Sequence, residues 1–116
     1  MDITYPVPWD ASYRRDPDAQ QTFDQTDSPL AFYRMLDHEQ EVLADWCDQL
    51  VKIKTINQRH SSYGLKHIFS SNAFYVTNGE FKGAMLAAGF TPDDKTRTNW
   101  CFNVSERSIK GAIAYG

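Results

Sequence analysis

The sequence predicts a single α+β domain with one long N-terminal amphipathic helix, two shorter helices and a small antiparallel sheet near the C-terminus. Three observations indicate this fold class: a long apolar stripe at helical spacing, two helix-start signals after residue 60, and an alternating stretch at residues 99–105. The chain has 116 residues, of which 41% are hydrophobic, and this is enough apolar material for one packed core.

Residues 1–27 are predicted to form an extended arm. Pro6 and Pro8 flank Val7, which favours extended backbone, and the stretch after Trp9 is polar without sustained periodicity. The arm nevertheless carries large apolar side chains, so we expect it to lie across the core rather than to move freely: Tyr5, Val7, Trp9, Tyr13 and Phe23.

Residues 28–56 are predicted to form the long helix. Ser28 is a suitable N-cap, and Pro29 is favourable at the first helical position. The stripe predicts about 25 helical residues packed on their own domain. The alternative is a dimerising seam, which would need more heptads. Apolar residues recur at spacings of four and three, interrupted at Glu39: Phe32, Leu36, Leu43, Trp46, Leu50 and Ile53.

Residues 60–116 are predicted to continue as helix, helix and strand. Ser61 or Ser62 can cap a first short helix that ends at residues 70–72. Near the C-terminus, apolar residues alternate with Cys101 and Asn103, which is typical of a half-buried strand: Trp100, Phe102 and Val104. The last apolar residues have spacings that fit either a helical turn or a partner strand: Ile109, Ala112 and Ile113.

The stretch around Asn78-Gly79 has two interpretations. This pair is the commonest two-residue hairpin turn. However, Thr77 and Glu80 also form a capping box, which starts a helix. The apolar residues that follow lie on one helical face and stop before Gly89, a favourable residue after a helix end. The pattern therefore favours a helix.

The charges of the chain are unevenly distributed. Residues 1–50 contain eleven Asp or Glu and three Arg, a net charge of −8, whereas residues 51–116 contain four Asp or Glu and nine Lys or Arg, a net charge of +5. Such asymmetry can indicate a binding surface, or it can be solvated charge on two halves that attract each other. Four acidic residues of the long helix share one face, which we predict to bind a basic groove of a partner: Asp37, Glu41, Asp45 and Asp48.

The alternative function is a DNA-binding regulator that uses the basic half. The two shorter helices and the strand could be arranged as a helix-turn-helix with a wing. However, their connection of about six residues is longer than the usual three or four, and an acidic residue lies in the first turn of the would-be recognition helix. In this alternative, basic side chains contact the phosphates: Lys66, Lys82, Lys95 and Arg97.

The sequence contains no catalytic, cofactor or metal signature. His60 and His67 have no further ligand one helical turn away, so a zinc site would need distant residues. Cys47 and Cys101 occupy positions that suit small buried hydrophobic residues rather than activated thiolates. Phosphate-binding glycine motifs are absent. We therefore expect a protein that is not an enzyme and needs no cofactor, with an unrecognised hydrolase or transferase as the third alternative.

The expected location is the cytoplasm. No apolar run approaches the roughly 18 residues of a membrane span. The N-terminus has neither the basic nor the apolar segment of a secretory signal, and two cysteines are too few for a disulfide framework.

Four stretches resemble a family of small uncharacterised proteins from bacterial phages, plasmids and integrated elements: Ser62 to Ile68, Tyr75 to Phe81, Leu86 to Phe90 and Asn99 to Ser105. The resemblance covers about residues 60–105 and implies a setting in a bacterial host cell, but no activity. Small proteins of mobile elements often inhibit host defence, as anti-CRISPR proteins do, or regulate their own element. We therefore expect a non-enzymatic binding protein that blocks a host protein or nucleoprotein.

Overall fold

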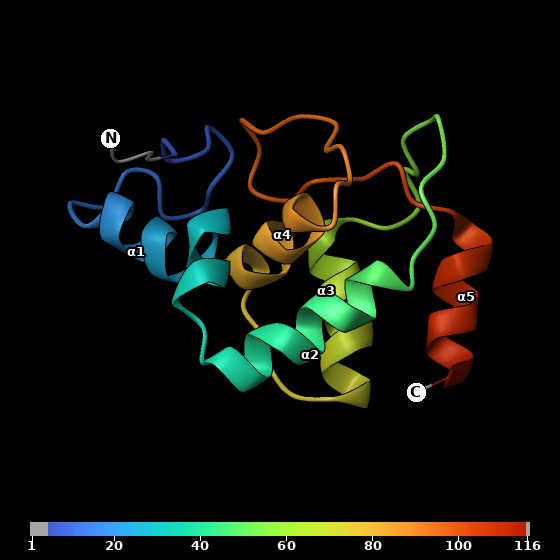
Figure 1. Cartoon of the computed structure of the whole chain (residues 1–116). Coiled ribbons are helices and arrows are strands. Elements are labelled where there is room, and N and C mark those ends of the chain that lie inside the picture. The colour runs from blue at the N-terminus through green and yellow to red at the C-terminus, as the bar shows by residue number, and fades with distance from the viewer. Residues whose placement is uncertain (1–4, 116) are drawn as a thin grey trace.

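The computed structural model describes residues 5–115, which form helices joined by irregular segments (Figure 1). Among these residues, no helix is both long and apolar enough to cross a membrane. The described residues contain five α-helices and one 3-10 helix: α1 (Ala19–Thr26), η1 (Pro29–Arg34), α2 (Asp37–Asp48), α3 (Ser62–Asn72), α4 (Asn78–Ala87) and α5 (Glu106–Tyr115).

The predicted α+β fold is wrong, because residues 99–105 do not become a strand of a sheet. No strand forms within residues 5–115. The stretch instead makes isolated antiparallel bridges to three different segments of the chain: Lys52 with Val104, Ser61 with Cys101, and Pro92 with Phe102. No single segment runs beside residues 99–105 for long enough to build a ladder.

Residues 99–105 change backbone partners too often for a ladder to form. At Asn103 the backbone pairs with two segments at once, its carbonyl accepting from the Ile53 amide (2.9 Å) and its amide donating to the Thr91 carbonyl (3.3 Å). The Asn103 side chain adds one bond on each side, accepting from the Thr91 amide (2.7 Å) and donating to the Ile53 carbonyl (3.1 Å). The alternating pattern of residues 99–105 nevertheless predicted burial correctly. Its three apolar residues are fully buried: Trp100, Phe102 and Val104.

The predicted long helix over residues 28–56 is also wrong. The helix that begins after Ser28 is the six-residue η1, and α2 is a separate helix of 12 residues. Between them Met35 and Leu36 are extended, with ψ of 155° and 140°. Leu36, a member of the predicted apolar stripe, is 73% exposed. Residues 49–56 of the predicted helix are irregular.

Local interactions favour this break. At the end of η1 the Phe32 carbonyl accepts a hydrogen bond from the Gln40 side chain (2.8 Å), which satisfies a group that a continued helix would have used. Asp37 and Glu39 place negative charge in the first turn of α2, where the helix dipole favours it. Glu39, which interrupts the apolar stripe in the sequence, therefore belongs to a helix start.

The predicted extended arm contains a helix. α1 occupies residues 19–26 and buries Ala19 and Phe23, which are four residues apart. Its other positions are polar, so the sequence offers only two apolar residues at helical spacing, too few to reveal the helix. Residues 5–18 are irregular, and residues 1–4 of the predicted arm lie outside the described residues.

The two later helix starts are confirmed. Ser61 caps α3, its Oγ accepting a bond from a first-turn backbone amide (3.3 Å). Thr77 and Glu80 form the predicted capping box at α4, with distances of 3.1 Å and 2.8 Å. Gly89 follows α4 with a φ of 92°, which glycine adopts without strain. Residues 109–113, compatible with a helix or a strand, belong to α5.

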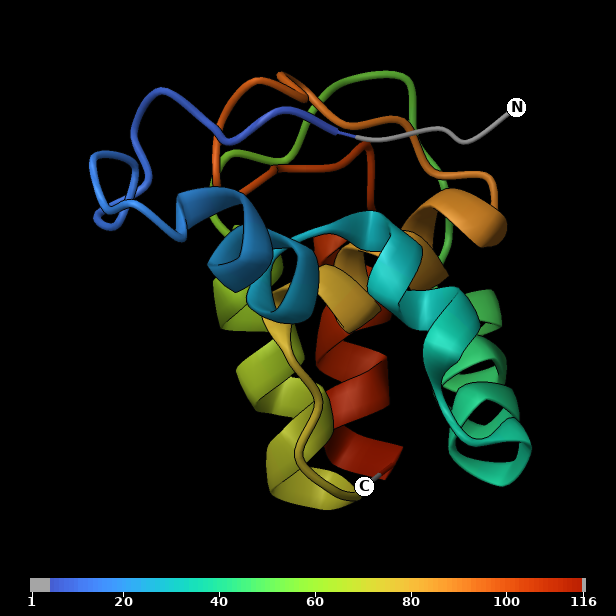
Figure 2. The ribbon, with the colours of Figure 1, turned by 90° about the vertical axis from the view of Figure 1, so that its left-hand side faces the viewer.

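α4 is the central element of the fold, with α1, η1, α2 and α3 packed around it (Figure 2). Two glycines allow η1 and the residues before it to approach α4 closely. A Cβ atom on Gly79 would lie 2.3 Å from the Ser28 carbonyl oxygen, and one on Gly83 would lie 2.1 Å from the Pro29 carbonyl oxygen. Any larger residue at either position would push the two segments apart.

Gly83→Ala should destabilise the protein by roughly 1–3 kcal/mol, because the added methyl group overlaps backbone atoms that cannot rotate away. Gly111→Ala in α5 is the matched control, since a Cβ there has no neighbour within 4 Å. That substitution should be neutral or stabilising by up to about 1 kcal/mol. Urea unfolding followed by circular dichroism measures both. Equal effects of the two substitutions would contradict the close approach of α4 and η1.

Candidate functional site

The structure brings the four predicted acidic residues together on the exposed side of α2. At about 100° per residue they fall within roughly 80° of the helix circumference. All four are exposed, and we call this surface the acidic face: Asp37, Glu41, Asp45 and Asp48. None forms an ion pair with the described part of the chain, where the ion pairs join His60 to Glu106 and Arg97 to Asp10. The acidic face is therefore uncompensated.

A groove of about 250 Å³ lies beside the acidic face, between α2, α3 and α5. Asp45 belongs to both the acidic face and the groove wall, so the two features are continuous. The Trp46 ring, which lines the groove, packs edge-on against Phe69, with ring centroids 5.6 Å apart. The lining residues come from three helices, and this is why the sequence alone did not reveal the groove: Val42, Asp45, Trp46, Gln49, Phe69, Asn72, Ala73 and Ala112.

The four basic residues predicted for nucleic-acid binding do not form one exposed surface. Lys66 and Lys82 are only 5% and 0% exposed, whereas Lys95 and Arg97 lie in an exposed loop. The helix-turn-helix arrangement does not fit the structure either. Seven of the ten residues of α4, the would-be recognition helix, are buried in the centre of the domain, so α4 cannot enter a DNA groove.

Lys66 is held between two exposed tyrosines. Its Nζ lies 5.1 Å from the centre of the Tyr63 ring and 4.8 Å from that of Tyr75. His67 packs edge-on against Tyr63, with ring centroids 4.5 Å apart. Burial lowers the pKa of Lys66. The ammonium group is thus engaged by aromatic rings of its own chain rather than presented to a phosphate.

Lys82 is buried in the interior. Its Nζ donates to the Thr98 carbonyl (2.9 Å) and lies 4.4 Å from the centre of a Trp100 ring. Burial lowers the pKa of Lys82 to about 8, although the nearby carboxylates of Asp27 and Asp10 oppose this shift. A buried amine with a lowered pKa is a feature of some catalytic sites, so its surroundings decide its role.

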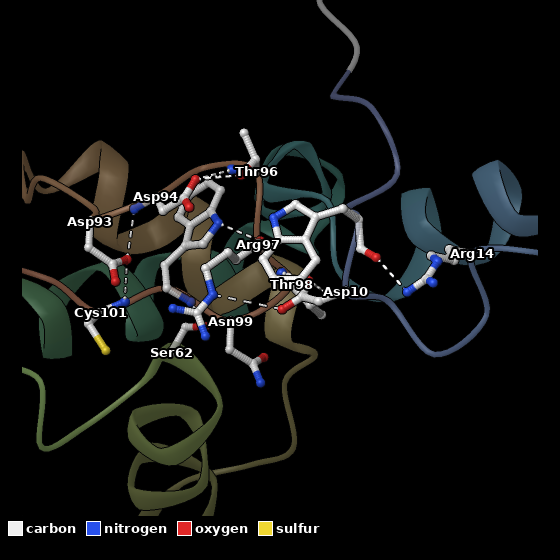
Figure 3. A network of polar contacts seen from close by, with 12 residues as sticks. Asp10, Arg14, Ser62, Asp93, Asp94, Thr96, Arg97, Thr98, Asn99 and Cys101 are labelled. Atoms are coloured by element: carbon white, nitrogen blue, oxygen red, sulfur yellow. Dashed lines mark hydrogen bonds and ion pairs between the residues drawn. The ribbon is translucent and has the colours of Figure 1, made fainter.

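The polar groups around Lys82 join distant segments of the chain. Asn78 donates to Asp27 (2.9 Å) and to the Thr98 carbonyl (3.1 Å). Asp10 accepts from the backbone amide of Thr98 (2.8 Å) and from its hydroxyl (2.9 Å), and Figure 3 shows Asp10 directed at Arg97 as well. These bonds tie residues 10–27 to the loop before Trp100 through α4.

The buried polar groups of this network are all hydrogen-bonded within the protein. Within the described residues, every buried side-chain nitrogen and oxygen has a hydrogen-bond partner. Lys82 is fully buried and lines neither the groove at α2 nor a cavity of about 220 Å³ beside η1. Its amine contacts a carbonyl and an aromatic ring of the protein itself, and these contacts join α4 to the loop before Trp100.

The two thiols and His60 differ in burial and in partners. Cys47 is fully buried, and burial, with a smaller effect of Asp48, raises the pKa of its thiol. Cys101, predicted to be buried, is only half-buried, and this burial raises the pKa of its thiol. His60 bonds to Glu106 (2.9 Å), which connects the 51–61 segment to the start of α5. No cluster of three or more His, Cys, Asp or Glu with the geometry of a metal site occurs in residues 5–115.

Comparison with known protein families, with characterised proteins and with solved structures finds no match to this chain.

Lys82→Met tests the buried amine through the pH dependence of stability. The pKa of Lys82, about 8 in the folded chain, lies below its ordinary value of 10.5, so the unfolded chain binds more protons between these limits. Stability contributed by this position therefore rises with pH in that window. The unfolding free energy of the wild type relative to Lys82→Met should increase by about 2 kcal/mol from about pH 8 to about pH 10.

Urea titrations at the two pH values measure this difference. Comparing the two proteins cancels the opposite contributions of the thiols and of Tyr13, whose raised pKa values make the folded state less stable at high pH. Lys110→Met, at an exposed position of α5, is the control. An identical change with pH in both variants would show that Lys82 is not desolvated.

Proposed function

We propose that this protein is a non-enzymatic binding protein whose acidic face covers a basic surface of a larger host protein or nucleoprotein and blocks it. The observation that carries this proposal is the exposure of all four carboxylates on one helix without an ion pair from the described chain. An acidic surface of this kind competes with nucleic acid for the same Lys and Arg residues.

Most of the acidic face is unfavourable for the free protein, although the helix dipole favours the charge of Asp37 in the first turn of α2. Asp37 with Glu41, and Glu41 with Asp45, are like charges four residues apart, and each such pair costs about 0.2–0.5 kcal/mol. Asp45 and Asp48 also lie near the C-terminal end of α2, where the helix dipole disfavours negative charge and no basic residue offsets it. A basic partner would relieve both effects, which supports binding as the role of this surface.

The competing function, nucleic-acid binding by the basic half, loses its main support. Two of its four contact residues, Lys66 and Lys82, are buried, and α4 is inaccessible. The resemblance to proteins of mobile elements agrees with an inhibitor of host defence, of which anti-CRISPR proteins are one kind. The partner in this proposal is therefore a protein or nucleoprotein of the bacterial host.

Reversing Glu41 and Asp48 to Lys should abolish partner binding while leaving the fold intact, because exposed charges contribute little to stability. The matched control reverses Asp16 and Asp18, which are exposed outside α2. Tagged protein is used to capture partners from host lysate at increasing salt. We expect the wild type and the control to capture the same host protein, which the α2 variant should not capture. Increasing salt should elute this host protein, because salt screens the charges that hold it. Identical capture by all three proteins would contradict the proposed function.

A gel-shift experiment separates the two functions directly. At about 50 mM salt, where phosphate-driven binding is strong, the wild type should shift neither duplex nor single-stranded DNA. Lys95→Glu with Arg97→Glu is the informative variant, since these are the exposed members of the predicted basic set. A clear shift by the wild type that this variant loses would replace the proposed function by nucleic-acid binding.

A further inference from the structure

The groove beside the acidic face has an apolar floor and a single charged wall. Trp46 and Phe69 supply aromatic surface, and Val42 and Ala112 supply aliphatic surface. Asp45 is the one charged residue among those that line it. A ligand that fits must therefore combine an apolar stem with a positive charge.

Neutral acceptors stand beside Asp45. The Asn72 side chain uses its nitrogen to donate to the Ile68 carbonyl (2.9 Å), so its oxygen stays available as an acceptor. The Gln49 amide also lines the groove and can offer a second oxygen. Together with the Asp45 carboxylate, these two amide oxygens give the groove three side chains that can accept hydrogen bonds.

Two helix ends add to the negative potential. Gln49 is the C-cap of α2 and Ala73 is the C-cap of α3, and both line the groove. Helix C-termini carry partial negative charge through their unpaired carbonyls. Neither helix has a basic residue in its last turn to offset that charge. The groove therefore has a negative potential that favours a cation, and none of its described lining residues is basic.

We propose that this groove binds an arginine side chain of the protein partner. The inference rests on the proposed function and specifies which residue of the partner is recognised. The methylene stem of arginine packs against Val42 and Ala112, and its guanidinium lies against the Trp46 ring, where cation–π attraction is strongest among aromatic residues. Arginine is favoured over lysine because its planar fork of five N–H donors reaches Asp45 and the two amide oxygens together.

The test titrates the isotope-labelled full chain with hexa-arginine, blocked at both ends, and with hexa-lysine, and follows binding by NMR. Hexa-arginine should shift the Trp46 indole N–H and the side-chain amides of Gln49 and Asn72. It should bind more tightly than hexa-lysine. Asn72→Leu, which removes an acceptor without changing charge, should reduce that preference.

Two matched charge removals locate the binding. Asp45→Asn should lower the affinity for hexa-arginine about tenfold, the equivalent of one lost charge-assisted hydrogen bond. Asp48→Asn removes the same charge from the acidic face but does not line the groove, and its effect should be about twofold, as for a screened surface charge. Spectra that otherwise match the wild type show that both variants are folded.

The outcomes distinguish the groove from the acidic face. Equal weakening by Asp45→Asn and Asp48→Asn, or equal affinity for the two peptides, overturns the arginine site and leaves the proposed function standing. If neither peptide binds even at about 50 mM salt, where screening is weak, the acidic face does not bind cations and the proposed function falls as well.

Discussion

The close approach of α4 to η1 is the constraint on which the rest of the structure depends. Gly79 and Gly83 leave one face of α4 without side chains, so the backbone of residues 27–32 can pack directly against it. The adjacent positions Asn78 and Lys82 turn polar groups into the interior. Those groups must be hydrogen-bonded where they lie, and Thr98 and Asp27 provide the partners. One helix thereby fixes the N-terminal segment, η1 and the loop before Trp100.

The same constraint decides which charges reach the surface. Of the nine basic residues in the second half of the chain, Lys66 and Lys82 are buried. In the described part of the first half, Asp27 is the one buried acid. The exposed surface is therefore more acidic than the net charge of −3 would suggest. This redistribution weakens the case for nucleic acid as a ligand and strengthens the case for a basic partner.

Sequence patterns predicted what depends on a few neighbouring residues. The capping signals at Ser61 and Thr77 were sufficient, because a cap is formed within four residues. The division of residues 28–56 was predicted wrongly although part of its signal is local, since Asp37 and Glu39 mark the first turn of α2. The other part, the packing of η1 against glycines about 50 residues away, cannot be seen in a short stretch of sequence. The members of the acidic face could be predicted, since they share one helix. The burial of Lys82 could not be predicted, because its neighbours come from residues 10–27 and 98–100.

The break at Met35 and Leu36 links the fold to the proposed site. η1 packs against α4. α2 is a separate helix, and its buried Leu43 and Cys47 hold it to the core. Its opposite side is free to carry four carboxylates, whose mutual repulsion remains in the unbound protein. A cation bound at Asp45 would relieve part of that repulsion. The relief of repulsion within α2 would then contribute to the free energy of binding. In the proposed function the acidic face and the groove would act together, because a basic partner would neutralise the same carboxylates that repel one another in the free helix.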